Sequence, residues 1–326
     1  MLEVTPINAR QWSRFGSRAV FGQAILALAE RKPDLVVLSA DLGNSSGLDR
    51  FKNAHPDKFI NVGIAEQNLI GVAAGFAKEG FTVFATSFAP FISMRAAEQV
   101  RMNLGYMNLN VKAVGIGSGL SMGFLGNSHY GLEDAGVIRC IPGITIVTPA
   151  DCSEIVKTVF AAAEHTGPMY IRLTGGPNNP IVYSAEYEFR IGKAVTLREG
   201  SDVTIIACGM MVYESLEAAK LLEVKGVSTR VINMHTLKPL DQDVLQNAFR
   251  TSKLIVTVEE HSVVGGLGSA VAEFKAGLSR VPPQLILGLP DEFGKTGEHR
   301  YLLEKYGLVA VGIAEKILAR LRQDAD

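Results

Sequence analysis

The sequence predicts an α/β protein of two domains, each a mainly parallel β-sheet flanked by helices. Short runs rich in β-branched residues alternate with longer helical stretches, first from about residue 17 and again after residue 200. These runs are apolar at nearly every position, which is typical of parallel strands covered on both faces. A stretch rich in Gly, Pro and Asn at 176–190 separates the two series, and 326 residues suit two domains.

The first series contains six expected strands and five expected helices. The strands are expected at 35–40, 59–63, 82–88, 111–117, 144–150 and 169–175. The helices are expected between them, at 17–31, 65–79, 93–105, 133–139 and 152–165. We therefore expect a first domain over 1–178.

The second series follows a linker expected at 179–193 and defines a second domain over 194–326. Its strands are expected at 202–209, 228–234, 253–260 and 284–290. Its helices are expected at 212–225, 240–250, 266–278 and 312–322.

Charge and composition exclude several classes of protein. The 32 Lys and Arg and 33 Asp and Glu leave a net charge of −1, so nothing favours nucleic acid or an anionic membrane surface. No run of 18 apolar residues predicts a membrane span, and MLEVTPINARQWSR lacks the apolar core of a signal peptide. The three cysteines have no CxxC spacing and suit a reducing compartment. We expect a cytoplasmic protein.

Chemically useful residues follow several of the expected strands. Asp41 follows the first strand, Glu66 the second, Phe88 and Phe91 the third, and His129 lies beyond the fourth. In an open parallel sheet, ligands bind beyond the carboxyl ends of the strands. The sequence therefore predicts one site at this edge.

Each of these residues also has a simpler interpretation. Glu66 opens a helix, where a carboxylate is favoured by the helix dipole; alternatively, it lies in an apolar cleft and can share its proton with a heteroaromatic nitrogen. Phe88 and Phe91 are either core residues or a stacking surface for a flat ring. His129 lies in a Gly-rich loop and is either solvent-exposed or functional.

Other catalytic motifs are weak or absent. GIGSG at 115–119 has Leu120 where the third glycine of a dinucleotide loop would stand. No GxxxxGK[ST], HExxH or GxSxG occurs, which disfavours P-loop, zinc-protease and serine-hydrolase chemistry.

An ordered set of segments resembles the C-terminal half of the transketolase family, which includes deoxyxylulose phosphate synthase. The resemblance covers nearly the whole chain, about 17–317. It is carried by SADLGNSSG (39–47), FINVGIAEQNLIGVAAGFA (59–77), ATSFAPF (85–91), GNSHYGLEDAGVIRCIPGITIVTPAD (126–151), KPLD (238–241), VTVEEHSVVGGLGS (256–269) and GLPDEF (288–293). It implies a thiamine diphosphate pyrimidine-binding domain followed by the family's C-terminal domain.

The resemblance implies roles for the strand-end residues. Glu66 matches the glutamate that bonds N1′ of the aminopyrimidine and so assists removal of the thiazolium C2 proton. Phe91 matches the residue stacked on the pyrimidine, Phe88 a neighbouring wall, and Asp41 an acid near the thiazolium. His129 matches the histidine of the family's THQ motif, which contacts substrate oxygens and assists proton transfer.

The resemblance also implies a substrate-anion site and shows departures from the family pattern. Arg18 and Ser45 match positions that hold a substrate phosphate. A further phosphate-binding arginine of the family falls near Gly175, with Arg172 as a substitute three residues earlier. Three other positions depart as well: Leu125 replaces an Asp, Gly117 a His and Tyr130 the Gln of THQ. A ketose other than xylulose 5-phosphate is therefore plausible.

The family's GDG…N segment, which holds Mg²⁺ and the diphosphate, has no match in this chain. The resemblance then implies one subunit of a split transketolase, paired with an N-terminal-type subunit in an α2β2 complex. Thiamine diphosphate would bind between unlike chains, with Mg²⁺ held by the partner and no metal ligand expected in this chain. Substrates would be sugar phosphates, with neither nucleic acid nor membrane as a partner.

We therefore predict ketol transfer from a ketose to an aldose, and four alternatives remain. Two are related enzymes: a synthase that decarboxylates a 2-oxo acid, and the β subunit of a 2-oxo acid dehydrogenase. The others are a non-catalytic regulatory homologue and a nicotinamide oxidoreductase, which the broken glycine motif disfavours.

Overall fold

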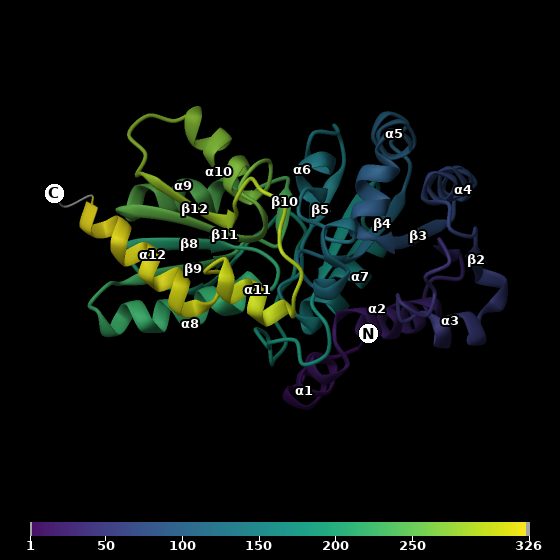
Figure 1. Cartoon of the computed structure of the whole chain (residues 1–326). Coiled ribbons are helices and arrows are strands. Elements are labelled where there is room, and N and C mark those ends of the chain that lie inside the picture. The colour runs from purple at the N-terminus through teal and green to yellow at the C-terminus, as the bar shows by residue number, and fades with distance from the viewer. Residues whose placement is uncertain (1, 324–326) are drawn as a thin grey trace.

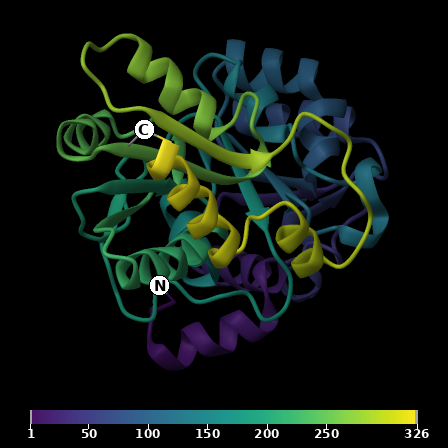
Figure 2. The ribbon, with the colours of Figure 1, turned by 60° about the vertical axis from the view of Figure 1, so that its left-hand side comes forward.

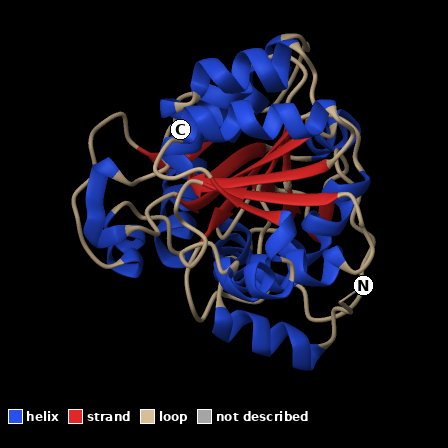
Figure 3. Cartoon of the chain, turned by 90° about the vertical axis from the view of Figure 1, so that its right-hand side faces the viewer, coloured by secondary structure: helices blue, strands red, loops and turns tan. Residues whose placement is uncertain are grey.

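The computed structural model describes residues 2–323, and within them two β-sheets lie side by side, each flanked by helices (Figure 1). The first domain is drawn in purple to teal and the second in green to yellow. Helices cover the strands on both sides (Figure 3). The predicted fold class, two α/β domains with mainly parallel sheets, is confirmed.

The first sheet has seven strands, and all of its pairings are parallel except that of β10 with β5. Their spatial order is β10 (Thr236–Lys238), β5 (Thr145–Val147), β6 (Met169–Thr174), β4 (Val111–Ser118), β3 (Thr82–Phe88), β1 (Leu35–Ser39) and β2 (Phe59–Asn61). Alternate residues of β1 enter opposite cores: Val37 packs on one face and Leu38 on the other. This double burial explains why the strands read as continuous apolar runs.

Two helical layers enclose this sheet. One face carries α1 (Pro6–Phe15), α2 (Ser17–Ala29), α3 (Asp49–Ala54) and α7 (Cys152–Glu164). The other carries α4 (Glu66–Lys78), η2 (Phe91–Arg95), α5 (Ala97–Gln99), η3 (Val100–Tyr106) and α6 (Asp134–Arg139). Two short 3₁₀ turns, η1 (Pro56–Lys58) and η4 (Gly123–Ser128), lie in the loops.

The second sheet has five strands and its own helical layers. Its order is β12 (Gln284–Leu289), β11 (Leu254–Ser262), β8 (Val203–Ala207), β9 (Thr229–Asn233) and β7 (Val195–Arg198), with only β7 antiparallel. On one face α8 (Met211–Val224) packs beside α12 (Ala310–Gln323), the latter in yellow in Figure 2. The remaining helices are α9 (Gln242–Thr251), α10 (Leu267–Ala276) and α11 (His299–Lys305).

Several elements differ from the sequence-based prediction. The helix expected at 93–105 is broken into the π-helical turns η2 and η3 around α5. The short elements α1, α3, β7, β10 and α11 were not predicted. The N-terminus of α1 nevertheless carried a signal, because Thr5 caps it and Pro6 occupies its first turn.

Strand β10 lies in the second series of the sequence but pairs with the sheet of the first domain, so the two domains are not separated at a single point of the chain. Residues 236–238 belong to the second series in sequence, yet they form the edge strand of the first sheet. One hydrophobic cluster also continues from Leu69 and Ile138 in the first domain to Leu245 and Leu267 in the second. The bounds 1–178, 179–193 and 194–326 stay a prediction.

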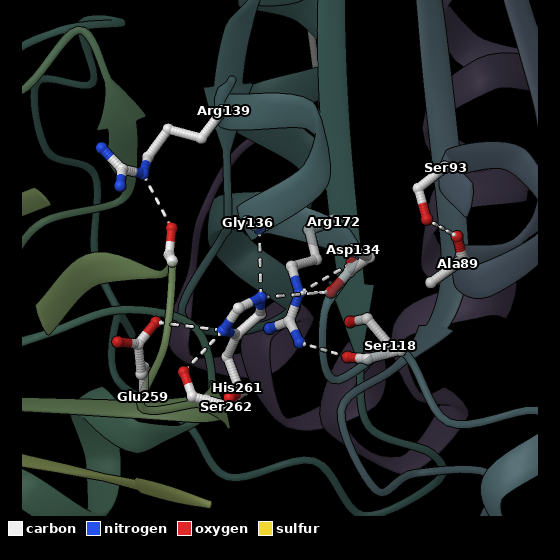
Figure 4. A network of polar contacts seen from close by, with 12 residues as sticks. Ala89, Ser93, Ser118, Asp134, Gly136, Arg139, Arg172, Glu259, His261 and Ser262 are labelled. Carbon is white, nitrogen blue, oxygen red and sulfur yellow. Dashed lines mark hydrogen bonds and ion pairs between the residues drawn. The ribbon is translucent and has the colours of Figure 1, made fainter. Parts of the chain in front are cut away.

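A buried arginine lies at the junction of the two domains (Figure 4). Arg172 on β6 donates from Nε to the Asp134 carboxylate at 2.9 and 3.0 Å. Its Nη2 donates to the backbone oxygens of Gly131 and Glu260, each at 2.7 Å. Burial acts to lower the pKa of Arg172, but the opposing effects of its neighbours, Asp134 foremost, together leave the pKa above the usual arginine range.

His261 and Glu259 of β11 extend this junction. The buried ring of His261 accepts from the Gly136 N–H at 3.2 Å through Nε2, while Nδ1 donates to the Ser262 carbonyl at 2.8 Å. Glu259 accepts from the N–H groups of Leu267 and Gly268 at 2.7 Å each, and so caps α10. Side chains of β11 thus order the second domain and hold it against α6 (Figure 4).

A second buried polar cluster lies where α7 meets β9. Glu154 accepts from the Ala150 N–H at 2.7 Å, from Asn233 Nδ2 at 2.9 Å and from the Tyr187 hydroxyl at 3.0 Å. Burial is the main cause that raises the pKa of Glu154 to about 7. The same cause raises the pKa of neighbouring Asp151 to about 7.

Among residues 2–323, no helix is both long and apolar enough to cross a membrane.

Replacing Arg172 by Leu is expected to lower the free energy of unfolding by about 3–5 kcal/mol, because the buried Asp134 carboxylate loses its countercharge. Urea denaturation followed by circular dichroism measures this change. Arg101→Leu is the control, since Arg101 pairs with Glu98 on an exposed helix surface and its loss should hardly move the midpoint. Equal midpoints for wild type and Arg172→Leu would contradict the role given to this pair.

Replacing Glu154 by Gln is expected to stabilise the protein increasingly, relative to wild type, as pH rises. The folded-state pKa near 7 exceeds the ordinary value of 4.5, so wild-type stability is complete below pH 4.5 and is lost as pH rises through 7. The difference should grow by roughly 3 kcal/mol between pH 4.5 and 8. Urea titrations of both proteins across this range measure it, and a constant difference would refute the assignment.

Candidate active site

Glu66 lies at the first position of α4 and is only 2% exposed. The turn before it needs Gly63 in a left-handed conformation, with φ of +78°. The Ser87 hydroxyl donates to Glu66 Oε1 at 3.0 Å, and Arg95 Nη1 donates to Oε2 at 2.9 Å. A carboxylate buried to this degree is oriented by its donors, which suits a group that must meet one ligand atom.

Ser87 and Arg95 were missed by the sequence reasoning. Ser87 comes from β3 and Arg95 ends the π-helical turn η2. The Arg95 guanidinium also lies 4.0 Å from the centroid of the Phe91 ring, so one side chain connects Glu66 with Phe91. Its side chain is 49% exposed, and it covers the site from the solvent side. π-helical turns are frequent at functional sites, but the sequence pattern gave no sign of one here.

Three rings form an aromatic group beside this carboxylate. The centroids of Phe88 and Phe91 lie 6.0 Å apart, and the His129 ring lies 5.6 Å from Phe88 and 5.2 Å from Phe91. All three pairs meet edge to face, and the Arg95 guanidinium lies over one face of the Phe91 ring. The structure therefore brings together four of the predicted residues: Glu66, Phe88, Phe91 and His129.

His129 is half-buried, and its ring is anchored on one side. The Ser128 hydroxyl lies 2.9 Å from His129 Nδ1. With Nδ1 engaged by its neighbour, Nε2 is the nitrogen that can face a ligand.

Asp41 lies at the end of β1 and is exposed. It adopts a left-handed backbone conformation with φ of +59°. Its N–H donates to Asn61 Oδ1 and its Oδ1 accepts from Asn61 Nδ2, both at 2.9 Å. Since β1 neighbours β3 in the sheet, Asp41 shares the edge that carries Phe88.

Arg18 and Ser45 line one pocket of about 260 Å³ at the same edge. Its other walls include Gly47 and the turn formed by Gly176 and Pro177. A guanidinium and a hydroxyl in one pocket are suited to an oxyanion.

Arg172 does not lie in this pocket, and the geometry speaks against its predicted role as a substrate ligand. It is buried at the domain junction, where Asp134 and two carbonyls engage its N–H groups. The alternation of side chains along β6 directs it with Tyr170 toward α6, away from any ligand.

The positions that depart from the family pattern have steric explanations in two cases. Gly117 and Gly175 both have positive φ, and a Cβ would lie 2.7 Å from the sulfur of Met122 or 2.6 Å from that of Met210. Neither position could take a larger residue without rearrangement. Leu125 is half exposed, whereas Tyr130 is buried.

The residues present fit the ring end of thiamine diphosphate. A buried carboxylate with fixed orientation and adjacent aromatic faces are the groups that an aminopyrimidine requires. Within residues 2–323, no three His, Cys, Asp or Glu side chains gather as a metal site.

Comparisons with known proteins identify the family of both domains. Residues 14–176 match the family model "Transketolase, pyrimidine binding domain", and residues 192–313 match "Transketolase, C-terminal domain". A 6-deoxy-6-sulfo-D-fructose transketolase subunit from Clostridium sp. is 42% identical and covers 90% of each chain. An apulose-4-phosphate transketolase subunit from Phocaeicola vulgatus is 39% identical over 92% of this chain and 96% of its own.

A solved structure gives the same result for the fold. It is described as a split gene transketolase in an inactive β4 tetramer, is 41% identical and has a TM-score of 0.84. The match covers 94% of this chain and 97% of that one. The chain therefore belongs to the transketolase family.

Proposed function

We propose that this chain is the C-terminal subunit of a split transketolase, which transfers a two-carbon ketol unit from an anionic ketose to an aldose. The observation that carries the proposal is the buried Glu66 carboxylate, oriented by Ser87 and Arg95 beside the Phe91 ring. Relatives of nearly the same length that are named as transketolase subunits support it.

Thiamine diphosphate, when bound, would supply the electron sink that this reaction requires. Glu66 would hold a proton at the aminopyrimidine nitrogen, because Ser87 and Arg95 fix its buried carboxylate in one orientation. Phe91, with Phe88 behind it, would orient the flat ring. Asp41 would act near the thiazolium, at the exposed side of the site.

His129 and the Arg18 pocket would handle the substrate. Through Nε2, His129 would bond substrate oxygens and move a proton at the breaking carbon–carbon bond. Arg18 and Ser45 would bind the terminal anion, which is a phosphate or another oxyanion. We leave Arg172 out of the proposed substrate site because it is buried in an ion pair.

A partner subunit would complete the site. Ile64, two residues before Glu66, and Phe124, in the loop that carries His129, are 79% and 80% exposed. Exposed apolar side chains next to a site mark a surface that another protein covers. The partner would be the N-terminal-type subunit in an α2β2 complex and would supply the ligands of Mg²⁺ and the diphosphate. The free cysteines of this chain suit a cytoplasmic location.

The chain, isolated from its own cells with thiamine diphosphate and Mg²⁺, is expected to form a complex of two copies with two N-terminal-type subunits. Native mass spectrometry measures the stoichiometry and the bound cofactor. Ketose-dependent transfer by that complex, without release of CO₂, separates a transketolase from a 2-oxo acid synthase. Full activity of this chain alone would contradict the need for a partner.

Replacing Glu66 by Gln is expected to lower the turnover of the complex by about 10²–10⁴-fold, since a neutral amide cannot take part in the proton transfer. Exchange of the cofactor C2 proton with D₂O, followed by NMR after acid quench, should slow in parallel. Glu98→Gln, on the exposed surface of α5, is the matched control. Unchanged exchange in Glu66→Gln would remove this residue from the mechanism.

A further inference from the structure

The two ends of the loop that carries His129 are hydrogen-bonded to each other. Gly119 and Gly131 exchange backbone hydrogen bonds of 2.8 and 3.2 Å, which defines a loop of residues 119–131. Between these glycines, the loop contains only the 3₁₀ turn η4. The position of His129 at the site therefore depends on what holds this loop from outside.

A segment of the second domain, residues 291–298, lies along the loop; we call it the brace segment. Asn127 Nδ2 donates to the Gly294 carbonyl at 2.8 Å, and the Gly297 N–H donates to the Gly123 carbonyl at 3.3 Å. The Tyr130 hydroxyl lies 2.9 Å from the Lys295 carbonyl. Three hydrogen bonds thus join the His129 loop to this segment of the second domain.

The two segments approach so closely that side chains are excluded at two positions. A Cβ on Gly123 would lie 2.2 Å from the Gly297 oxygen, and one on Gly126 would lie 2.5 Å from Cγ2 of Thr296. Gly126 also has a φ of +68°. The brace segment thus meets the loop backbone through its own backbone at Gly123 and through the Thr296 side chain at Gly126, and in packing this close a shift of the brace segment must move the loop.

The brace segment is itself fixed to the second domain, at its middle and just beyond its C-terminal end. The Lys295 N–H donates to the Tyr306 hydroxyl at 3.3 Å. Directly after the segment, His299 Nε2 lies 2.9 Å from Glu260 Oε1, which also accepts the Leu120 N–H of the loop at 2.6 Å. The second domain thus holds the start of the loop as well as its middle.

Tyr130 is the residue through which these contacts reach His129. It is buried, and its hydroxyl is shared between the carbonyls of Gly123 at 2.7 Å and Lys295 at 2.9 Å. It directly follows His129, and the N–H groups of both residues donate to the Gly126 carbonyl, at 2.9 and 3.1 Å. If the Tyr130 ring moves, the backbone of the adjacent His129 therefore moves with it, and so does the imidazole.

We propose that the second domain takes part in the reaction by positioning His129, with Tyr130 as the positioning residue and residues 291–298 as its support. The catalytic part of this inference rests on the proposed function, whereas the positioning of the loop does not. It assigns the second domain a role without any contact to cofactor or substrate.

Loss of the Tyr130 hydroxyl is expected to loosen the loop in the isolated chain. Hydrogen–deuterium exchange with mass spectrometry should show amides of residues 120–131 exchanging about fivefold faster in Tyr130→Phe, because one net hydrogen bond is lost. Asn127→Ala, which removes a different contact to the brace segment, should act in the same direction. Tyr183→Phe is the matched control: it removes the hydroxyl of another buried tyrosine, which bonds Asn233. If the amides of residues 120–131 exchange at the wild-type rate in both Tyr130→Phe and Asn127→Ala, the brace segment does not hold the loop.

The catalytic consequence is expected in the complex with its partner, thiamine diphosphate and Mg²⁺. With 3-hydroxypyruvate as donor and glycolaldehyde as acceptor, Tyr130→Phe should lower kcat about tenfold, with little change in KM or in the C2 proton exchange that depends on Glu66. Tyr183→Phe should leave kcat unchanged. In His129→Ala, the further change Tyr130→Phe should cost nothing more, since it acts only through the imidazole.

Two outcomes would refute positioning by Tyr130: a wild-type kcat in Tyr130→Phe, or fully additive losses in the double variant. The proposed function fails separately, through unchanged C2 exchange in Glu66→Gln. In that case, the exchange data on residues 120–131 still decide whether the brace holds the loop.

Discussion

How the two domains pack together depends on one buried guanidinium and on the groups that pair with its charge and its N–H donors. A cation taken out of water is tolerated only where a countercharge and further acceptors surround it. Arg172 finds these in the Asp134 carboxylate of α6, in the carbonyl that ends the His129 loop and in a carbonyl of β11 in the other domain. Arg172 therefore orders the first sheet, the His129 loop and the second domain relative to one another.

One half of the candidate site is buried and held by neighbouring elements, and the other half is exposed to solvent. Glu66 and Phe88 lie at the ends of elements buried in the first core, and Ser87 fixes the carboxylate from β3. Arg95, Ile64 and Asp41 face solvent in this chain. This division suits the proposed function, in which the buried half would be preorganised for the ring and the exposed half would meet a partner subunit.

The sequence predicted the central strands well and the edges poorly. Strands such as β3 and β4 are buried on both faces, so most of their residues are apolar and an apolar run marks each strand in the sequence. By contrast, β10 has three residues and exists because β5 offers it a partner, which no local pattern can reveal.

The same distinction explains the site residues. Glu66, Phe91 and His129 could be expected near one another because the segments after parallel strands meet at one edge of the sheet, and the structure brings them together. Arg172 was expected at the substrate because the family resemblance offered it in place of an arginine near Gly175, whereas the two-residue period of β6 turns it toward α6. Arg95 was missed because its reach back to Glu66 depends on a π-helical turn that ordinary helical spacing does not predict.

The antiparallel strand β10 has a consequence for how the chain is made. On the ribosome, residues 1–178 emerge some sixty residues before Thr236–Lys238, so a nascent first domain exposes the unpaired edge of β5. An open edge of this kind invites pairing with another nascent chain. The second half of the polypeptide thus protects the first half during synthesis, which ties the two domains into one unit of translation and folding.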